Sequence, residues 1–415
     1  MRGRTSTPCP RQRFPGGRLK PAFAPLAVAL LITARNDDAE LATRVGPVEV
    51  RIFVPAEAKI VRGILVHAAH YSLRTDDRWA ALCRQLRFAH AALAIDLKLT
   101  NRPKKLRDGL LQGLKEFADR SGHPELLHAP RAGVGHSAGG LVAAVLLEEP
   151  GRTLTNAVSC GWILDPAKLA PEAAKVPAIF TLGAIPDDFK MLHDIEGKFV
   201  PARERGLPWG LGVQWGCAHD FGNSATLFAA WIQGIAARRL PADADPGGGA
   251  ARLAELRPED GWLGDRSTTE GTYATIASWA DFKGDKAKAS WFPDRATARV
   301  WRAFQSRNSP LCLTAKVRDG DVSLPAFNPK SEFGMLVSAG KEIILGASIP
   351  EGTRIRKISF LCGDEIIGTS EAAPWLVSWN PRGPGCYPLF AEWELPDGTP
   401  GVTNPALISV IPERR

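Results

Sequence analysis

Residues 135–139 have the residue types and spacing of a nucleophilic serine. Gly135, Ser137 and Gly139 fit the pattern G-x-S-x-G. A serine at a sharp strand-to-helix turn sits on a strained backbone, and the residues two before and two after it must be small because strand and helix crowd together. The small, apolar segment 132–135 is typical of a buried strand, and residues 141–149 have helical spacing. This context favours a nucleophile over an incidental serine in a glycine-rich turn.

The segment Gly135-His136-Ser137-Ala138-Gly139-Gly140 resembles the nucleophile elbow of the α/β-hydrolase family. The likeness extends more weakly over about residues 45–240, and it points to secreted serine esterases and lipases, including dienelactone and polyester hydrolases. The resemblance implies a mostly parallel sheet with helices on both faces. It also implies a triad in the chain order serine, acid, histidine.

The resemblance implies that the base is His219, which follows a strand ending at Gln214 and precedes the last helix of the unit. In that role the imidazole removes the proton of Ser137 and later returns it to the leaving group. The alternative is a capping or solvent-facing histidine. His136, inside the elbow, is expected to be a packing residue that faces away from the reacting centre.

Three aspartates compete for the position that orients the histidine. The family's usual acid follows the preceding strand, often after a glycine, and here Gly183 is followed by Asp187 and Asp188, one residue further on than the family spacing. Asp165 ends an earlier strand, where some hydrolases take their acid, although it could also cap a helix before Pro166. We rank Asp187 first, Asp188 second and Asp165 third.

Two backbone N–H groups are needed to bind the oxyanion. One is expected from Ala138, directly after the nucleophile, and the resemblance implies His70 for the other. The sequence contains no G-x-G-x-x-G order, no C-x-x-C pair and no Cys/His metal spacing. We therefore expect neither a cofactor nor a metal ion.

The elements that must position these residues alternate between strand and helix. Such alternation predicts a mostly parallel sheet with helices on both faces, and ligands then bind at the carboxyl ends of the strands. Residues 48–55 are expected to form an edge strand closed by Pro55. The other expected strands are 63–69, 91–97, 132–135, 157–165, 178–183 and 210–215, and the expected helices are 77–88, 106–118, 141–149 and 224–237.

Composition describes an ordinary globular protein of 415 residues with 45% hydrophobic and 23% charged residues. Six basic residues lie between Arg2 and Lys20, where no acidic residue occurs, and without them the net charge falls from +8 to +2. We therefore expect no nucleic-acid partner. Residues 1–36 resemble a signal peptide or a disordered tail, with an apolar run too short for a stable membrane anchor, and we expect a secreted or periplasmic protein.

The chain divides by composition into three parts after the N-terminal segment. The catalytic unit is expected at 37–243, followed by a linker and Trp-rich extension at 244–320 that would be a lid, a wrap or a bridge. Residues 321–415 carry short strands with turn signals, a hairpin at 357–368 and a tight turn at Asp397-Gly398. They resemble a bacterial immunoglobulin-like β-sandwich, through Ile367-Gly368, Ala373-Pro374-Trp375 and Gly385-Cys386-Tyr387.

These features predict a carboxylic ester hydrolase that works through an acyl-enzyme. Its substrate would be a small-molecule or polymeric ester, including an acylated cell-wall polysaccharide, with carbohydrate or cell-surface contact through the C-terminal part. That part is expected to be dispensable for hydrolysis of a small ester. The alternatives are an inactive binding protein on the same fold, and a peptidase or acyltransferase with the same triad.

Overall fold

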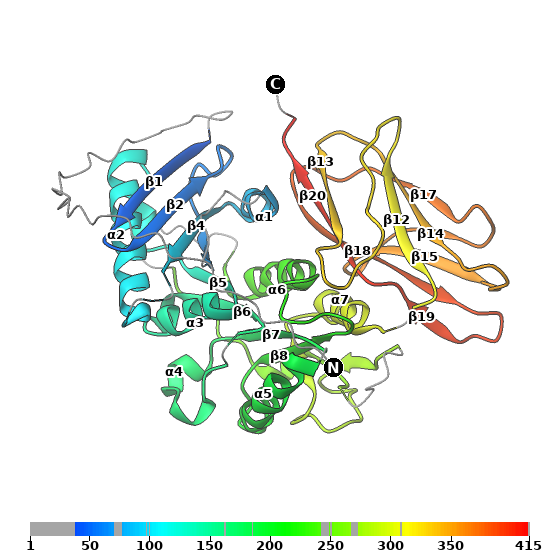
Figure 1. Ribbon diagram of the computed structural model, residues 1–415, viewed down its shortest axis with the longest axis horizontal. Coiled ribbons are helices and arrows are strands. Elements are labelled where there is room, and N and C mark those ends of the chain that lie inside the picture. The colour runs from blue at the N-terminus through cyan, green and yellow to red at the C-terminus, as the bar shows by residue number, and fades with distance from the viewer. Residues whose placement is uncertain are drawn as a thin grey trace, which may run out of the picture.

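The computed structural model describes residues 38–69, 77–96, 98, 100–161, 163–184, 186–241, 249, 251–266, 273–307 and 309–413. At residues 69, 95 and 186–192 it describes the backbone alone. The expected signal peptide at 1–36 and the expected oxyanion residue His70 therefore lie outside the described residues. Within them the chain forms an α/β unit (residues 38–241), an extension (251–307) and a β-sandwich (309–413), arranged as in Figure 1.

The α/β unit is built on an eight-stranded sheet in the order β1-β2-β4-β3-β5-β6-β7-β8. The six strands β3 to β8 run parallel to one another. At one end of the sheet, β2 pairs antiparallel with both β4 and β1. The strands are β1 (Ala39–Val45), β2 (Val48–Val54), β3 (Gly63–Ala69), β4 (Phe88–Ile95), β5 (Arg131–His136), β6 (Thr153–Ser159), β7 (Ala178–Gly183) and β8 (Trp209–Gln214).

Helices cover both faces of this sheet, as the alternation of strands and helices predicts. They are α1 (Asp77–Leu86), α2 (Arg102–Ser121), α3 (Leu141–Leu146), α4 (Pro171–Ala174), α5 (Pro186–Glu204) and α6 (Ser224–Arg239). Successive residues of a strand point to opposite faces. Accordingly Leu65 packs with α1 and α6, whereas its neighbours Ile64 and Val66 pack with α2 and α3.

The expected edge strand at 48–55 is an interior strand. A further strand, β1, precedes it and pairs with β2 from Ala39↔Val54 to Val45↔Val48, so that β2 lies between β1 and β4. Gly46, at φ 56°, lies in the tight connection between the two strands. Strand β2 ends at Val54, and Pro55 follows directly after its last paired residue.

The extension covers β8, which is the last strand of the sheet. It contributes β9 (Trp262–Gly264), β10 (Ile276–Ser278), β11 (Ser290–Phe292) and α7 (Arg295–Gln305). Ser290 Oγ accepts from Leu211 N at 3.0 Å and Gln305 Oε1 accepts from Val213 N at 3.2 Å, so side chains occupy edge donors of β8. Of the three roles left open by the sequence, the extension is a wrap on the α/β unit that continues through α7 into the sandwich.

The β-sandwich consists of two facing sheets. One holds β12 (Cys312–Val317), β14 (Ile343–Ser348) and β17 (Leu376–Trp379). The other holds β13 (Gly334–Ser338), β20 (Ala406–Ile411), β18 (Gly385–Glu394), β15 (Lys357–Cys362) and β16 (Glu365–Ser370), with β19 (Pro400–Val402) paired to β18. The immunoglobulin-like texture expected from the sequence is thus a real sandwich, and its first strand begins ahead of residue 321.

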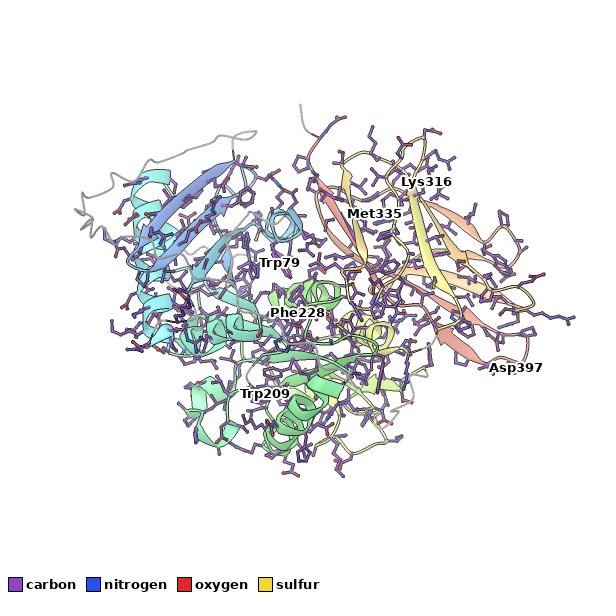
Figure 2. All side chains as sticks on the ribbon, in the orientation of Figure 1. Trp79, Trp209, Phe228, Lys316, Met335 and Asp397 are labelled. Carbon is purple, nitrogen blue, oxygen red and sulfur yellow. The ribbon has the colours of Figure 1, made fainter. Side chains whose placement is uncertain are left out.

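Three large apolar side chains, labelled in Figure 2, show which parts of the chain share a hydrophobic core. Met335 belongs to the sandwich's own core, whereas Trp79 of α1 and Phe228 of α6 belong to a cluster that crosses between the parts. That shared cluster also holds Leu361, Phe390 and Leu407 of the sandwich. The sandwich is therefore packed onto α1 and α6 through a continuous apolar interface.

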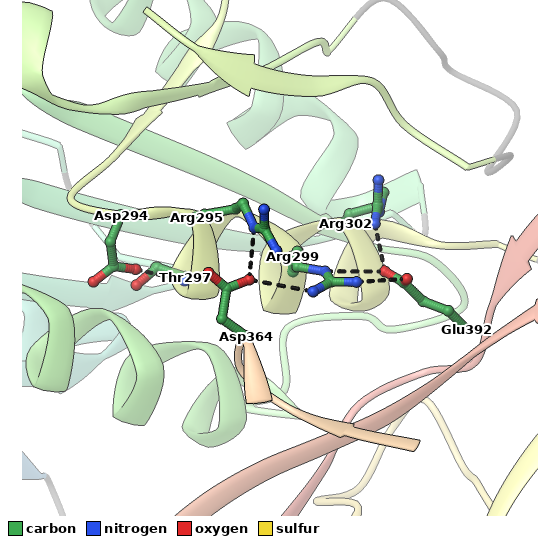
Figure 3. Close-up of polar contacts among 7 residues, drawn as sticks. All are labelled: Asp294, Arg295, Thr297, Arg299, Arg302, Asp364 and Glu392. Atoms are coloured by element: carbon green, nitrogen blue, oxygen red, sulfur yellow. Dashed lines mark hydrogen bonds and ion pairs between the residues drawn. The ribbon is translucent and has the colours of Figure 1, made fainter. Parts of the chain in front are cut away.

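An ion-pair network reinforces this interface along one face of α7 (Figure 3). Arg295 and Arg299 both reach Asp364, in the turn between β15 and β16, at 2.9 and 3.2 Å. Arg299 and Arg302 converge on Glu392 of β18. The amphipathic helix thus uses its apolar face on the α/β unit and its basic face on the sandwich.

Candidate active site

Ser137 lies where the strand-to-helix turn was expected. β5 ends at His136, and a 3-10 turn over Ser137–Gly140 leads directly into α3. Ser137 has φ 53°, a left-handed conformation that costs a non-glycine residue about 1–3 kcal/mol and persists only where the surroundings enforce it.

Glycines supply that enforcement. A Cβ added at Gly135 would overlap the backbone carbonyl of Gly139, and one added at Gly161 would lie 2.9 Å from the carbonyl oxygen of Ser137. The first of these is the glycine two residues before the serine in the G-x-S-x-G pattern. The pattern is therefore explained by the close approach of strand, turn and the end of β6.

His219 is brought to Ser137 from 82 residues further along the chain. It lies in the loop 215–223 between β8 and α6, and its Nε2 is 2.8 Å from Ser137 Oγ. The imidazole is exposed, and Ser137 is partly exposed. With the imidazole neutral and its proton on Nδ1, the serine hydroxyl donates to Nε2, which is the geometry in which a general base removes that proton.

Of the three candidate acids, Asp165 has other partners than His219. Its carboxylate accepts from Ala167 N at 3.0 Å, capping a short 3-10 turn, and lies 3.5 Å from Lys168 Nζ. Asp187 and Asp188 fall in the first turn of α5, directly after β7, and their side chains lie outside the described residues. This position of Asp187 and Asp188, directly after β7, is the one that the resemblance assigns to the acid.

The expected oxyanion donor Ala138 is the second residue of the 3-10 turn that starts at Ser137. The first N–H groups of a helical turn have no acceptor within the turn, which is the property that an oxyanion donor needs. The second expected donor, His70, falls outside the described residues.

Sequence reasoning missed several residues that hold the loop of His219. An added Cβ at Gly183 would overlap the carbonyl oxygen of Ala218, so the last residue of β7 must be small for the loop to pass. Cys160 Sγ lies 3.6 Å from the Asp220 carbonyl oxygen, beneath the same loop. The glycine at the end of β7 is the one signal in the sequence that could have been read this way.

His136 packs, as expected, but against the reacting pair. Its ring lies 5.4 Å from that of His219 and meets Phe221 edge-on at 6.0 Å, measured between ring centroids. Buried hydroxyls of β6, β7 and α6 are hydrogen-bonded to one another. Thr181 Oγ1 lies 2.7 Å from Ser224 Oγ, and Ser224 Oγ lies 3.2 Å from Ser159 Oγ.

No group of His, Cys, Asp and Glu side chains with metal-binding geometry occurs among the residues that the structure describes. Over the same residues, no helix is both long enough and apolar enough to cross a bilayer. A cleft of about 870 Å³ lies between α6, α7 and the sandwich, but neither Ser137 nor His219 lines it.

No family model matches the chain, and no curated protein matches it. Among solved structures, a dienelactone hydrolase from Anabaena variabilis is similar at 18% identity and a TM-score of 0.34, covering 49% of this chain and 98% of that one. An esterase from the archaeon Pyrobaculum calidifontis is similar at 15% and 0.35, covering 48% and 86%. Fibronectin(III)-like modules of Clostridium thermocellum CbhA match at 28% and 0.18, covering 19% and 85%. The mostly parallel sheet with helices on both faces, joined to a β-sandwich, is the fold class expected from the sequence.

Proposed function

We propose that the protein is a serine hydrolase of carboxylic esters. The observation that carries this proposal is the contact of 2.8 Å between His219 Nε2 and Ser137 Oγ, with the serine held at φ 53° on the turn after β5. A serine on a strained backbone, partly exposed and with its hydroxyl bonded to an imidazole, is the arrangement that activates a weak nucleophile.

In the proposed reaction Ser137 Oγ attacks the ester carbonyl carbon while His219 Nε2 takes the hydroxyl proton. The Ala138 N–H binds the developing oxyanion, with His70 as the second donor. The imidazolium then protonates the leaving alcohol, and the C–O bond to that alcohol breaks to give an acyl-enzyme. Water, deprotonated by His219, then attacks the acyl carbon. The bond from that carbon to Ser137 Oγ breaks as the imidazolium returns the proton to Oγ, and the acid is released. Asp187 is our choice for the carboxylate that orients His219.

The parts of the chain outside the site support a cellular location and a substrate class for this activity. The N-terminal segment supports export, and a β-sandwich on a hydrolase supports an ester carried by a polymer or a cell surface as substrate. Both belong to the proposal, and neither is needed for the chemistry at Ser137.

The assignment is tested with p-nitrophenyl acetate and with a fluorophosphonate probe, on the full chain. Ser137→Ala should abolish labelling and lower kcat by three orders of magnitude or more, as removal of a triad serine does. His219→Gln should lower kcat similarly. His123→Gln is the matched control, because His123 is also bonded to a side chain, Glu125 at 2.8 Å, in a segment after α2. Wild-type turnover retained in Ser137→Ala would overturn the assignment.

A further inference from the structure

Buried amide side chains connect the loop of His219 to the sandwich. Gln214, the last residue of β8, is buried, and its Oε1 accepts from Asn223 N at 2.9 Å. Its Nε2 donates to the carbonyl oxygen of Pro329, in the segment of the sandwich before β13. One amide thus holds the far end of the 215–223 loop on one side and the sandwich on the other.

Asn223 makes a second connection of the same kind. It is buried at the start of α6, and its Nδ2 donates to the Pro405 carbonyl oxygen at 2.6 Å, just before β20. Its Oδ1 accepts from Thr226 Oγ1 at 2.7 Å, which fixes the orientation of the amide. The two ends of the loop are therefore tied to two different segments of the sandwich.

The loop is shaped around these amides. Gly222, at φ 51°, lies so close to Gln214 that an added Cβ would be 2.6 Å from both of its amide atoms. Gly216, at φ 75°, faces Pro329, whose Cγ would lie 3.0 Å from an added Cβ. Directly before Gly216, Trp215 Nε1 donates to the Gln305 carbonyl oxygen at 3.1 Å, and the Arg307 guanidinium lies 5.0 Å from the Trp215 ring centroid. The start of the loop, Trp215 and Gly216, thus contacts the sandwich and the end of the extension.

From this geometry we infer that the sandwich positions His219, with Gln214 and Asn223 as the positioning residues that transmit its placement to the loop. This inference rests on the proposed function of the Ser137–His219 pair. A buried amide that satisfies two backbone groups is costly to break, because each partner is then left unpaired. A displacement of the base by as little as about 1 Å can cost on the order of 10²-fold in rate. The sandwich would then be a component of the catalytic machinery.

The test compares the buried amide Gln214 with a partly buried amide, Gln233, that also contacts the sandwich, on the full-length protein. We call the hydrogen bonds that Gln214 and Asn223 make to the loop and to the sandwich the amide brace. Gln214→Leu removes both bonds of the Gln214 side chain. Gln214→Glu retains the acceptor for Asn223 N and loses the donor to Pro329. The matched control is Gln233→Leu. Gln233 on α6 donates to the Cys386 carbonyl oxygen of the sandwich at 2.8 Å and to Gln85 Oε1 of α1 at 2.7 Å, outside the 215–223 loop. Kinetics with p-nitrophenyl acetate and hydrogen exchange of a peptide spanning 215–223 are measured for each.

The brace predicts that both Gln214 variants lose about ten- to a hundredfold in kcat with KM within about threefold of wild type, and exchange faster in the 215–223 peptide. Gln233→Leu should change neither. An unchanged kcat and unchanged exchange in folded Gln214→Leu would overturn the inference, as would an equal loss of kcat in Gln233→Leu. If Gln214→Leu does not fold, Gln214→Glu decides. A wild type that is inactive and unlabelled by the probe would sink the proposed function instead, while faster exchange in the Gln214 variants would still support the brace.

Discussion

Arg299 of α7 makes a two-point contact with Glu392 of β18, from Nε to Oε1 at 3.3 Å and from Nη2 to Oε2 at 2.7 Å. Arg302, one helical turn further on, also donates to Glu392, and its side chain is only 8% exposed. A carboxylate shared by two guanidiniums at a largely dry interface fixes both distance and angle between the helix and the sheet. The sandwich is therefore held in one orientation, which the amide brace at the 215–223 loop requires.

Removing this shared carboxylate should destabilise the whole chain. Glu392→Gln would leave Arg302 buried without its anion, and breaking a buried pair by removing one partner costs roughly 3 kcal/mol or more. We expect a lower midpoint in urea unfolding with little change in slope. Glu394→Gln is the control on the same strand, because its pair with Arg356 is solvated, with the arginine side chain 57% exposed. That variant should shift stability by less than about 1 kcal/mol.

Deleting the sandwich should impair the protein more than the sequence suggests. The change in strand texture indicates a separable tail, but Leu361, Phe390 and Leu407 share one apolar cluster with Phe228 and Trp231 of α6. A chain ending at residue 310 would expose that surface of α1 and α6 to water, and each large apolar side chain uncovered costs roughly 1.5–3 kcal/mol. We expect it to aggregate or to melt well below the full chain by circular dichroism. A truncated chain that melts cooperatively at the full-length temperature and keeps its kcat would contradict both this prediction and the brace.

A single methyl group at the end of β7 should separate activity from stability. In Gly183→Ala the new Cβ would overlap the Ala218 carbonyl oxygen, so the 215–223 loop has to move and carry His219 away from Ser137. We expect kcat to fall by at least about tenfold, since the rate depends steeply on the placement of the base. Turnover of p-nitrophenyl acetate and a thermal melt are the two measurements.

Gly197→Ala is the matched control for that experiment. Gly197 lies inside α5, and an added Cβ there meets nothing within 4 Å. Alanine in a helix interior is favoured over glycine by about 1 kcal/mol, so this variant should be slightly more stable and equally active. An unchanged kcat in Gly183→Ala would show that the loop absorbs the clash without moving the base.

The sequence was sufficient for the parts of the fold that depend on local pattern. Continuous apolar runs identified β3 and β7 at their observed bounds, and helical spacing located α1 and α6 within a few residues. It failed where long-range contacts decide. β1 mixes apolar residues with Glu40, Thr43 and Arg44 and becomes a strand through pairing with β2. The sequence predicts no helix at α5, because Pro201 lies inside it and its sequence is weakly amphipathic.

In the candidate site too, residues marked by local pattern could be predicted from the sequence, and residues defined by long-range contacts could not. Ser137 and His219 are marked by spacing and by position relative to strands, and the fold brings them together. Gln214 and Asn223 carry no such mark, because an amide becomes a brace only through carbonyls 115 and 182 residues further along the chain. Contacts of that sequence separation leave no periodic trace. The sequence left Asp165 open between an acid and a cap before Pro166, and the bond that it accepts from Ala167 N identifies it as a cap.

The acid of the triad should be Asp187, and three single substitutions decide it. Asparagine at the true acid preserves the shape but lets the imidazole adopt the wrong tautomer, at a cost of roughly 10⁴ in kcat in the best-studied triad. Asp165→Asn should change kcat by less than about tenfold, because that partly exposed carboxylate caps a turn and pairs with Lys168. Asp188→Asn should behave like Asp165→Asn, while Asp187→Asn should collapse turnover near neutral pH with the melting temperature little changed. If instead Asp188→Asn collapses turnover, the first turn of α5 presents the second carboxylate to His219. A collapse in Asp165→Asn alone would require the cap on the 3-10 turn Pro166–Lys168 to open during the reaction, because the Asp165 carboxylate accepts from Ala167 N in the structure.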